Sequence, residues 1–345
     1  MGGMMKLRSL NYALLSVLGS TIIATTASAD VNVYSYRQEY LIKPMLDEFT
    51  KETGIKVNAI YVKEGIAERL KREGKLSPAD IVLTVDISRL QELVNEGLVQ
   101  SFDSKVVDAN IPANFRTDDW VALTSRARAI YTSKDRVGRL PENFTYLDLA
   151  DPKYKGKVCV RSGKHPYNVS LLASIIEHHG EKAAKKWLEG VKANLARKPQ
   201  GGDRDQVKAI MEGVCDYALG NSYYYGNMLT NDKKPEQKQW AESAYINFPN
   251  QQAEGTHMNV SGVALTKYAP NKAEAIKLIE FLTGDKAQEM YADVNYEYPV
   301  KPGVPTSKLV ASWGTFKQDS VDLKKIAKYH KQALKLIDEV KFDVE

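Results

Sequence analysis

The sequence predicts an α/β fold of two lobes with a ligand cleft between them. Strand-like runs alternate with amphipathic helical runs along most of the chain, which is typical of α/β sandwiches. At 345 residues the chain has the length at which one core usually divides into two. Two extended runs, at 120–134 and 243–252, interrupt the alternation, and we expect the chain to cross between the lobes there.

The first set of elements covers residues 31–97. Alternating apolar residues predict strands, and apolar residues spaced at i, i+3 and i+4 predict helices. Gly54 favours a helix end, because glycine adopts the left-handed backbone that follows many helices. The predicted strands are 31–37, 55–62 and 79–85, and the predicted helices are 41–54, 65–74 and 87–97. Strands that alternate with helices in this way predict parallel βαβ units.

A second set of elements lies between the two extended runs. It comprises strands at 156–163 and 214–220 and helices at 168–180, 181–195 and 204–213. A strand and two helices then cover 259–294, and the tail from Lys308 is mostly helical. We therefore assign 30–127 and 248–300 to the N-terminal lobe, and 128–247 and 301–345, with the C-terminal helices, to the C-terminal lobe.

The N-terminus predicts export. Lys6 and Arg8 precede an apolar run at 10–26, and a small-residue cleavage sequence ends at Ala29. This three-part pattern is that of a secretory signal peptide over residues 1–29. We therefore expect a periplasmic protein.

Charge and composition limit the partners. The formal net charge is +5, and loss of Lys6 and Arg8 with the signal peptide lowers it by two, to +3. Acidic and basic residues are interleaved without a basic tail, so nucleic acid is not an expected partner. No cysteine follows the apolar run, which argues against a lipid-linked membrane anchor. We expect a monomer.

Two cysteines bring two tyrosines together. An isolated pair in an exported protein favours a disulfide, here between Cys159 and Cys215. Tyr167 and Tyr223 each follow one of these cysteines by eight positions. If the bonded cysteines lie on neighbouring strands in one register, both tyrosines emerge at the same end of the sheet. Tyr224 follows directly and joins the same cluster.

Converging phenols suit a hard metal ion. Ionised phenols repel one another unless a strong cation lies between them, and phenolate oxygen suits Fe(III) better than Zn(II) or Cu(I). The alternative is that the tyrosines only fill a core or a rim. Tyr225 has this packing role in our interpretation, or it supports the ligands through a hydrogen bond.

Several longer stretches resemble the bacterial periplasmic ferric-ion-binding proteins, the substrate-binding components of iron ABC transporters. The similarity extends over essentially the whole chain after residue 29. It is carried by VNVYSYRQ, SPADIVLTVDISRL, TSRARAIYTSKDRVG, YKGKVCVRSGK, ARKPQGGDRDQV, CDYALGNSYYYG and SGVALTKYAPNKAEA. The resemblance implies the periplasmic-binding-protein fold with a two-strand hinge, and an inner-membrane ABC permease as the partner. It also implies that Tyr223 and Tyr224 bind the metal, with Tyr167 as the added tyrosine of the tyrosine-rich branch.

The sequence departs from the family pattern in the N-terminal lobe. Family members that use a histidine and a glutamate from this lobe place them where this chain has Gln38 and Val85. The resemblance therefore implies that an anion such as carbonate completes the metal shell. We expect Arg126 to anchor the anion, because a guanidinium offers a planar two-pronged donor, with Arg37 as the candidate from the N-terminal lobe. Gln38, Tyr40 and Tyr225 are candidates to contact the ligands without binding the metal themselves.

Two other functions stay open from the residues alone. An aromatic cleft can stack on an organic ligand such as a polyamine or a sugar. A polyamine site would place carboxylates beside the aromatic rings, whereas Arg37 and Arg126 have the opposite charge. An exported enzyme that uses tyrosine as an acid or base is the second alternative. We find no nucleophile elbow, phosphate loop or triad, so we do not expect an enzyme.

Overall fold

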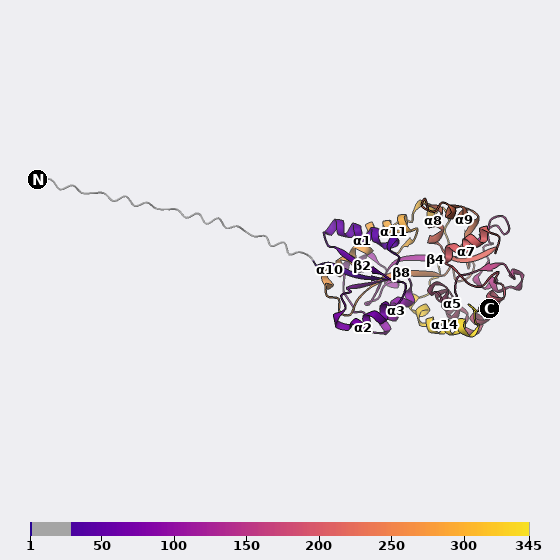
Figure 1. Ribbon diagram of the computed structural model, residues 1–345, viewed down its shortest axis with the longest axis horizontal. Helices are drawn as coiled ribbons and strands as arrows, with labels where there is room; N and C mark the ends of the chain where they lie inside the picture. The colour runs from indigo at the N-terminus through magenta and orange to yellow at the C-terminus, as the bar shows by residue number, and fades with distance from the viewer. Residues whose placement is uncertain (2–28, 345) are drawn as a thin grey trace.

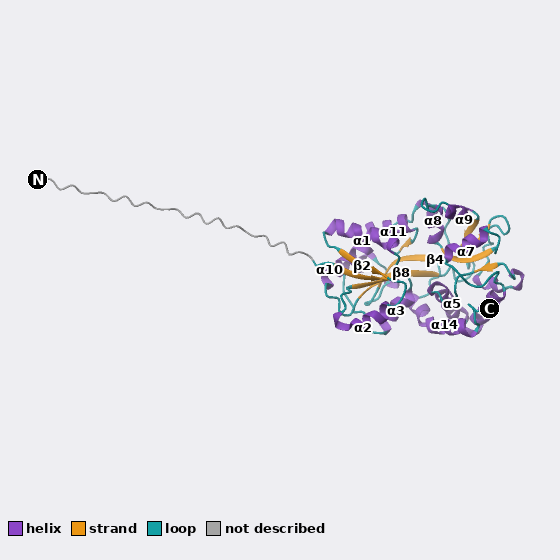
Figure 2. Ribbon diagram, in the orientation of Figure 1, coloured by secondary structure: helices purple, strands orange, loops and turns teal. Residues whose placement is uncertain are grey.

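The computed structural model describes Met1 and residues 29–344, so most of the predicted signal peptide lies outside the described residues. Helical layers flank the strands on both sides, and the elements gather into two groups joined by long central strands (Figure 1, Figure 2). The predicted two-lobe α/β architecture is therefore confirmed. No helix within residues 29–344 is long and apolar enough to cross a membrane.

The N-terminal group contains three parallel strands that alternate with helices. β1 pairs with β2 on one side and with β3 on the other, and β8 joins β3 in the antiparallel direction. α3 begins where the Asp86 carboxylate accepts a hydrogen bond from the Ser88 N–H at 2.7 Å. The elements are β1 Val31–Ser35, α1 Glu39–Thr53, β2 Val57–Tyr61, α2 Ile66–Glu73, β3 Ile81–Thr84, α3 Ile87–Asn95, α4 Lys105–Asn110, β8 Met258–Leu265, α10 Lys272–Thr283, α11 Asp285–Asn295 and β9 Tyr298–Pro299.

The C-terminal group is built around the short parallel pair of β5 and β6. β6 and β7 both pair with the second half of β4 in the antiparallel direction. The elements are β5 Val158–Cys159, α5 Pro166–His179, α6 Glu181–Ala193, α7 Asp203–Met211, β6 Tyr217–Asn221, α8 Tyr223–Leu229, α9 Glu236–Glu242 and β7 Ala244–Asn247.

One long strand connects the two groups. β4 (Val121–Ser133) pairs with β8 as far as Ala127 and with β6 from Arg128 onward. Its partner therefore changes at the residue where we predicted the lobe boundary. The return crossing runs between β7 and β8. The exact lobe boundaries stay a prediction.

The C-terminal tail packs along both groups. It contains α12 Lys308–Ala311, α13 Leu323–Lys328 and α14 His330–Glu339. α13 contacts α3 in the N-terminal group and α5 in the C-terminal group, and α14 lies along α5.

The parallel units predicted for residues 31–97 are confirmed, because β1 runs parallel to both β2 and β3. The whole sheet is mixed, since β4 and β8, whose directions were not predicted, run antiparallel to their neighbours. One helix start differs from the prediction. The helix predicted from 168 begins at Pro166, since proline at a first helical position needs no N–H partner. Tyr167 consequently lies in the first turn of α5, and Tyr223 opens α8.

Candidate functional site

A disulfide lies beneath the tyrosines. Cys159 and Cys215 are bonded, with their Cα atoms 5.9 Å apart, which confirms the predicted pair. The predicted shared register is wrong, because Cys159 lies opposite Ala218 and Cys215 precedes β6. The segment between β5 and α5 compensates for this difference in register. The hydroxyls of Tyr167 and Tyr223 therefore still lie in contact. The equal spacing of eight residues is therefore not the reason for their convergence.

Three tyrosines form one cluster. The hydroxyl oxygens of Tyr167 and Tyr223 lie 3.2 Å apart. The rings of Tyr223 and Tyr224 have centroids 4.2 Å apart and an interplanar angle of 35°. Tyr167 and Tyr223 are buried, and Tyr224 is half-buried. Two helix starts, α5 and α8, thus direct phenol oxygens toward a shared point.

Tyr225 points elsewhere. Its hydroxyl donates to the backbone carbonyl of Ala244 at 3.1 Å. Its ring packs against Tyr131 and Trp313, with centroids 5.9 and 5.6 Å away. The helical turn of about 100° per residue carries this side chain into the core of the C-terminal group. The structure does not bring Tyr225 together with the other three.

Burial keeps Tyr223 and Tyr224 protonated. Loss of hydration raises the pKa of Tyr223 and of Tyr224 well above the ordinary value of about 10. Negative charge on Tyr167 would raise both pKa values further, and the guanidinium of Arg126 partly offsets this rise at Tyr223. A metal ion must therefore displace protons to bind these oxygens.

Arg37 and Arg126 share one buried carboxylate. Glu297 is fully buried and pairs with both guanidiniums, at 2.6 Å from Arg126 Nη2. Both arginines also donate to the Ser261 hydroxyl, and Arg126 donates to the Val85 carbonyl. Burial alone raises the pKa of Glu297, but the two guanidiniums outweigh it and hold the pKa below its usual value.

This group leaves a positive charge beside the cluster. Two guanidiniums surround one carboxylate, and the Arg126 guanidinium carbon lies 5.6 Å from the Tyr223 ring centroid. The Nε atoms of Arg126 and Arg37 have no hydrogen-bond partner among the described residues. We expected Arg37 to face an anion from the N-terminal lobe. In the structure it forms an ion pair with Glu297 instead.

A second arginine–carboxylate group lies on the other side of the cluster. Asp203 is buried and pairs with Arg128 at 2.7 Å and with Arg161 at 3.2 Å. Both guanidinium carbons lie within 6 Å of the Tyr167 ring centroid, at 5.9 and 5.5 Å. Burial raises the pKa of Asp203, but the two arginines and the Asn221 N–H bring it below the usual value.

A hydrogen bond joins the two lobes near Tyr224. Tyr40 in α1 accepts a hydrogen bond from Arg204 Nη2 in α7 at 3.0 Å. The Arg204 guanidinium also lies 5.2 Å from the Tyr224 ring centroid. Gln38, in contrast, is exposed at the start of α1 and caps no N–H with its side chain. Of these two α1 candidates, Tyr40 and not Gln38 therefore reaches the surroundings of the tyrosines.

His165 supports the cluster as a neutral ring. Its Nδ1 accepts from the Tyr167 N–H at 3.3 Å, and its ring packs against the Tyr167 ring with centroids 4.4 Å apart. Burial and the nearby Arg161 lower the pKa of His165 to about 3. No group of three histidine, cysteine or acidic side chains within residues 29–344 is arranged to hold a metal ion.

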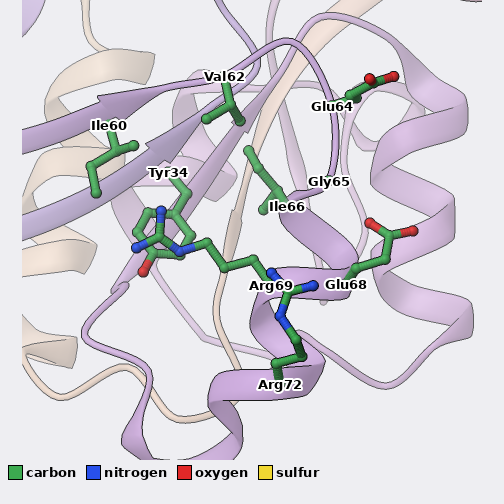
Figure 3. A pocket seen from close by; sticks show the side chains of 9 residues that line it. All are labelled: Tyr34, Ile60, Val62, Glu64, Gly65, Ile66, Glu68, Arg69 and Arg72. Atoms are coloured by element: carbon green, nitrogen blue, oxygen red, sulfur yellow. The ribbon is translucent and has the colours of Figure 1, made fainter.

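A separate cavity lies in the N-terminal group. It has a volume of about 430 Å³, and the side chains around it include Tyr34, Ile60 and Arg69 (Figure 3). The Arg69 guanidinium carbon lies 4.3 Å from the Tyr34 ring centroid and so covers that ring. No member of the tyrosine cluster lines this cavity.

Comparisons with known proteins give the family. Residues 77–315 match the family of bacterial extracellular solute-binding proteins. The iron uptake protein A1 of Synechocystis is 44% identical, over 90% of this chain and 86% of its own length. The crystal structure of apo ferric ion-binding protein A from Pasteurella haemolytica is 64% identical, with a TM-score of 0.88, over 91% of this chain and 98% of that one. The chain belongs to the bacterial periplasmic ferric-iron-binding protein family.

Family membership confirms the predicted fold and resemblance. The proteins of this family bind solutes and are not enzymes, so the tyrosine acid–base alternative is excluded. A further relative of known structure, from Trichodesmium, is described in complex with iron and citrate ligands. It is 41% identical over 91% of this chain and all of that chain, with a TM-score of 0.84.

Two functional residues escaped the sequence analysis. Glu297 lies between two tyrosines in the sequence Tyr-Glu-Tyr-Pro. An acidic residue within an aromatic run is a signal of a buried ion pair. Asp203 stands directly before the helix predicted at 204–213, and in the structure it is the first residue of α7 and its carboxylate pairs with arginines. The partners could not be assigned, because the pairs join residues more than 40 positions apart.

Proposed function

We propose that this protein captures Fe(III) through the phenolate oxygens of Tyr167, Tyr223 and Tyr224 and delivers it to an inner-membrane ABC importer. The observation that carries the proposal is the 3.2 Å separation of the Tyr167 and Tyr223 hydroxyls, with the Tyr224 ring centroid 4.2 Å from that of Tyr223. Three phenolates offset the charge of a trivalent ion, and hard oxygen donors suit Fe(III). The charges disfavour a polyamine ligand, since guanidiniums lie against the rings and the two nearby carboxylates are already paired with arginines.

We propose further that a small oxyanion, carbonate in the first instance, completes the iron shell. Around the tyrosines, five guanidiniums (Arg37, Arg126, Arg128, Arg161 and Arg204) face two buried carboxylates, so positive charge is in excess. Binding Fe(III) to three phenolates adds no net charge. The excess therefore persists in the iron complex and favours an anion.

Iron titration tests the proposal. Added Fe(III), supplied as its nitrilotriacetate complex, should give a coloured one-to-one species, because ferric phenolate absorbs visible light. Its affinity should rise with pH, and at least about two protons, one each from Tyr223 and Tyr224, should be released per iron. The affinity rises with pH because the pKa values of Tyr223 and Tyr224 are raised. At any pH below these pKa values, protons compete with iron for the phenol oxygens. A colourless complex, or binding independent of pH from 5 to about 8, contradicts the proposal.

Arg126 tests the anion. We expect Arg126→Ala to speed iron release and to make release less sensitive to added bicarbonate, because the charge nearest Tyr223 is lost. The measurement is the release rate to excess chelator with and without bicarbonate. Arg116→Ala, which removes a paired arginine in the N-terminal group, is the control. Identical bicarbonate dependence in wild type and Arg126→Ala removes Arg126 from the anion site.

A further inference from the structure

We infer that Arg128 is a positioning residue that sets the separation of the two tyrosine-bearing helix starts, and this inference rests on the proposed function. The guanidinium lies between α5, which carries Tyr167, and the end of β6, which leads into Tyr223 and Tyr224. It is 2% exposed, so its role is not that of a surface charge.

The contacts of Arg128 reach three elements. Nη2 donates to Asn168 Oδ1 at 2.6 Å, next to Tyr167 in α5. Nη1 donates to Asn221 Oδ1 at 3.0 Å, two residues before Tyr223. Nη1 also donates to Asp203 Oδ2 at 2.7 Å, at the start of α7. One rigid planar group therefore links the start of α5, which carries Tyr167, to the end of β6, which leads into Tyr223.

Two of the three acceptors are themselves held by backbone groups. Asn168 Nδ2 donates to the carbonyls of Arg161 and Ser162, each at 3.1 Å, in the segment that enters α5. Asp203 Oδ2 also accepts from the Asn221 N–H at 2.7 Å. Because Asn168 and Asp203 are held in this way, rotation of their side chains alone cannot absorb a shift of the guanidinium. Such a shift therefore moves Tyr167 relative to Tyr223.

A lysine substitution distinguishes the role of the planar shape of Arg128 from the role of its charge. A lysine at this position keeps the positive charge for Asp203, but its single ammonium on a flexible stem lacks the planar fork that reaches both asparagines. If Arg128 acts only through charge, Arg128→Lys should bind iron like wild type. If it acts by position, Arg128→Lys should resemble Arg128→Gln.

The experiment loads wild type, Arg128→Lys, Arg128→Gln and the control Arg136→Lys with ferric nitrilotriacetate. Arg136 also pairs with an aspartate in the C-terminal group, but it contacts none of the three tyrosines. We expect Arg128→Lys to shift the visible band and to release iron to excess chelator about tenfold faster, the factor that loss of one charge-assisted hydrogen bond gives. The control should match wild type.

Three outcomes overturn the inference. If Arg128→Lys matches wild type while Arg128→Gln does not, the role is one of charge. If both variants show a lower Tm with an unchanged band and release rate, the role is in folding alone. If neither variant folds, Asn168→Ala removes one acceptor at a partly exposed site, and an unchanged release rate there also overturns it. A colourless wild type is a different result, because it refutes the proposed function itself.

Discussion

Replacing a single clustered tyrosine with phenylalanine should have the largest effect on iron binding. Tyr167→Phe, Tyr223→Phe and Tyr224→Phe each remove one anionic oxygen from a site with three. We expect affinity to fall at least roughly 100-fold in each, since even residues that only support metal ligands contribute about 10- to 100-fold. The visible band should shift or disappear. Competition titration against a chelator, read at that band, measures both effects.

Tyr225→Phe is the matched control in the same tripeptide. Its hydroxyl binds the Ala244 carbonyl and not the cluster, so its loss should leave the band and the affinity unchanged. A modest loss of stability, about 1 kcal/mol for one buried hydrogen bond, is expected instead. If Tyr225→Phe abolishes the colour while Tyr224→Phe keeps it, the orientation of the tripeptide is wrong.

The second large effect concerns stability. Glu297→Gln leaves two buried guanidiniums facing each other without a carboxylate, because Arg37 and Arg126 both pair with Glu297. Removing one partner from a buried ion pair typically costs about 3–5 kcal/mol, and we expect a loss of this size in the free energy of unfolding. Denaturant unfolding of the iron-free protein measures it.

A double variant tests the electrostatic cause. Arg37→Met combined with Glu297→Gln removes one positive and one negative charge, so the net charge of the group is that of the wild type. We expect the double variant to recover much of the stability lost in Glu297→Gln, since an ion pair replaced by neutral side chains often costs little. A double variant as unstable as Glu297→Gln points to lost packing and not to unpaired charge.

The sequence predicted most helices and strands because their apolar periodicity is local. α1, α3, α6 and β4 lie within a few residues of their predicted positions. The directions of β4 and β8 could not be predicted in the same way, because their antiparallel pairing joins distant segments of the chain. β5 is only two residues long, against the eight predicted, since its pairing with β6 ends at Cys159 and residues 160–162 are irregular before the turn at Gly163.

The candidate metal ligands could be predicted from the sequence, but the ion pairs that surround them could not. Tyr167, Tyr223 and Tyr224 come together in the structure, although the register argument that led to their convergence was wrong. The pairing of arginines with Glu297 and Asp203 depends on the folded chain and leaves no local pattern. We therefore expected a free guanidinium on Arg126 for the anion. In the structure this guanidinium already pairs with the carboxylate of Glu297.

The iron position is the most direct test of the account. A crystal structure of the iron-loaded protein, with anomalous scattering measured on both sides of the iron absorption edge, locates the metal independently of any refinement. We predict one strong peak within about 2.2 Å of the hydroxyl oxygens of Tyr167, Tyr223 and Tyr224, the range of short bonds from oxygen ligands to small metal ions. A peak elsewhere, or one that contacts fewer than two of these three oxygens, contradicts the account.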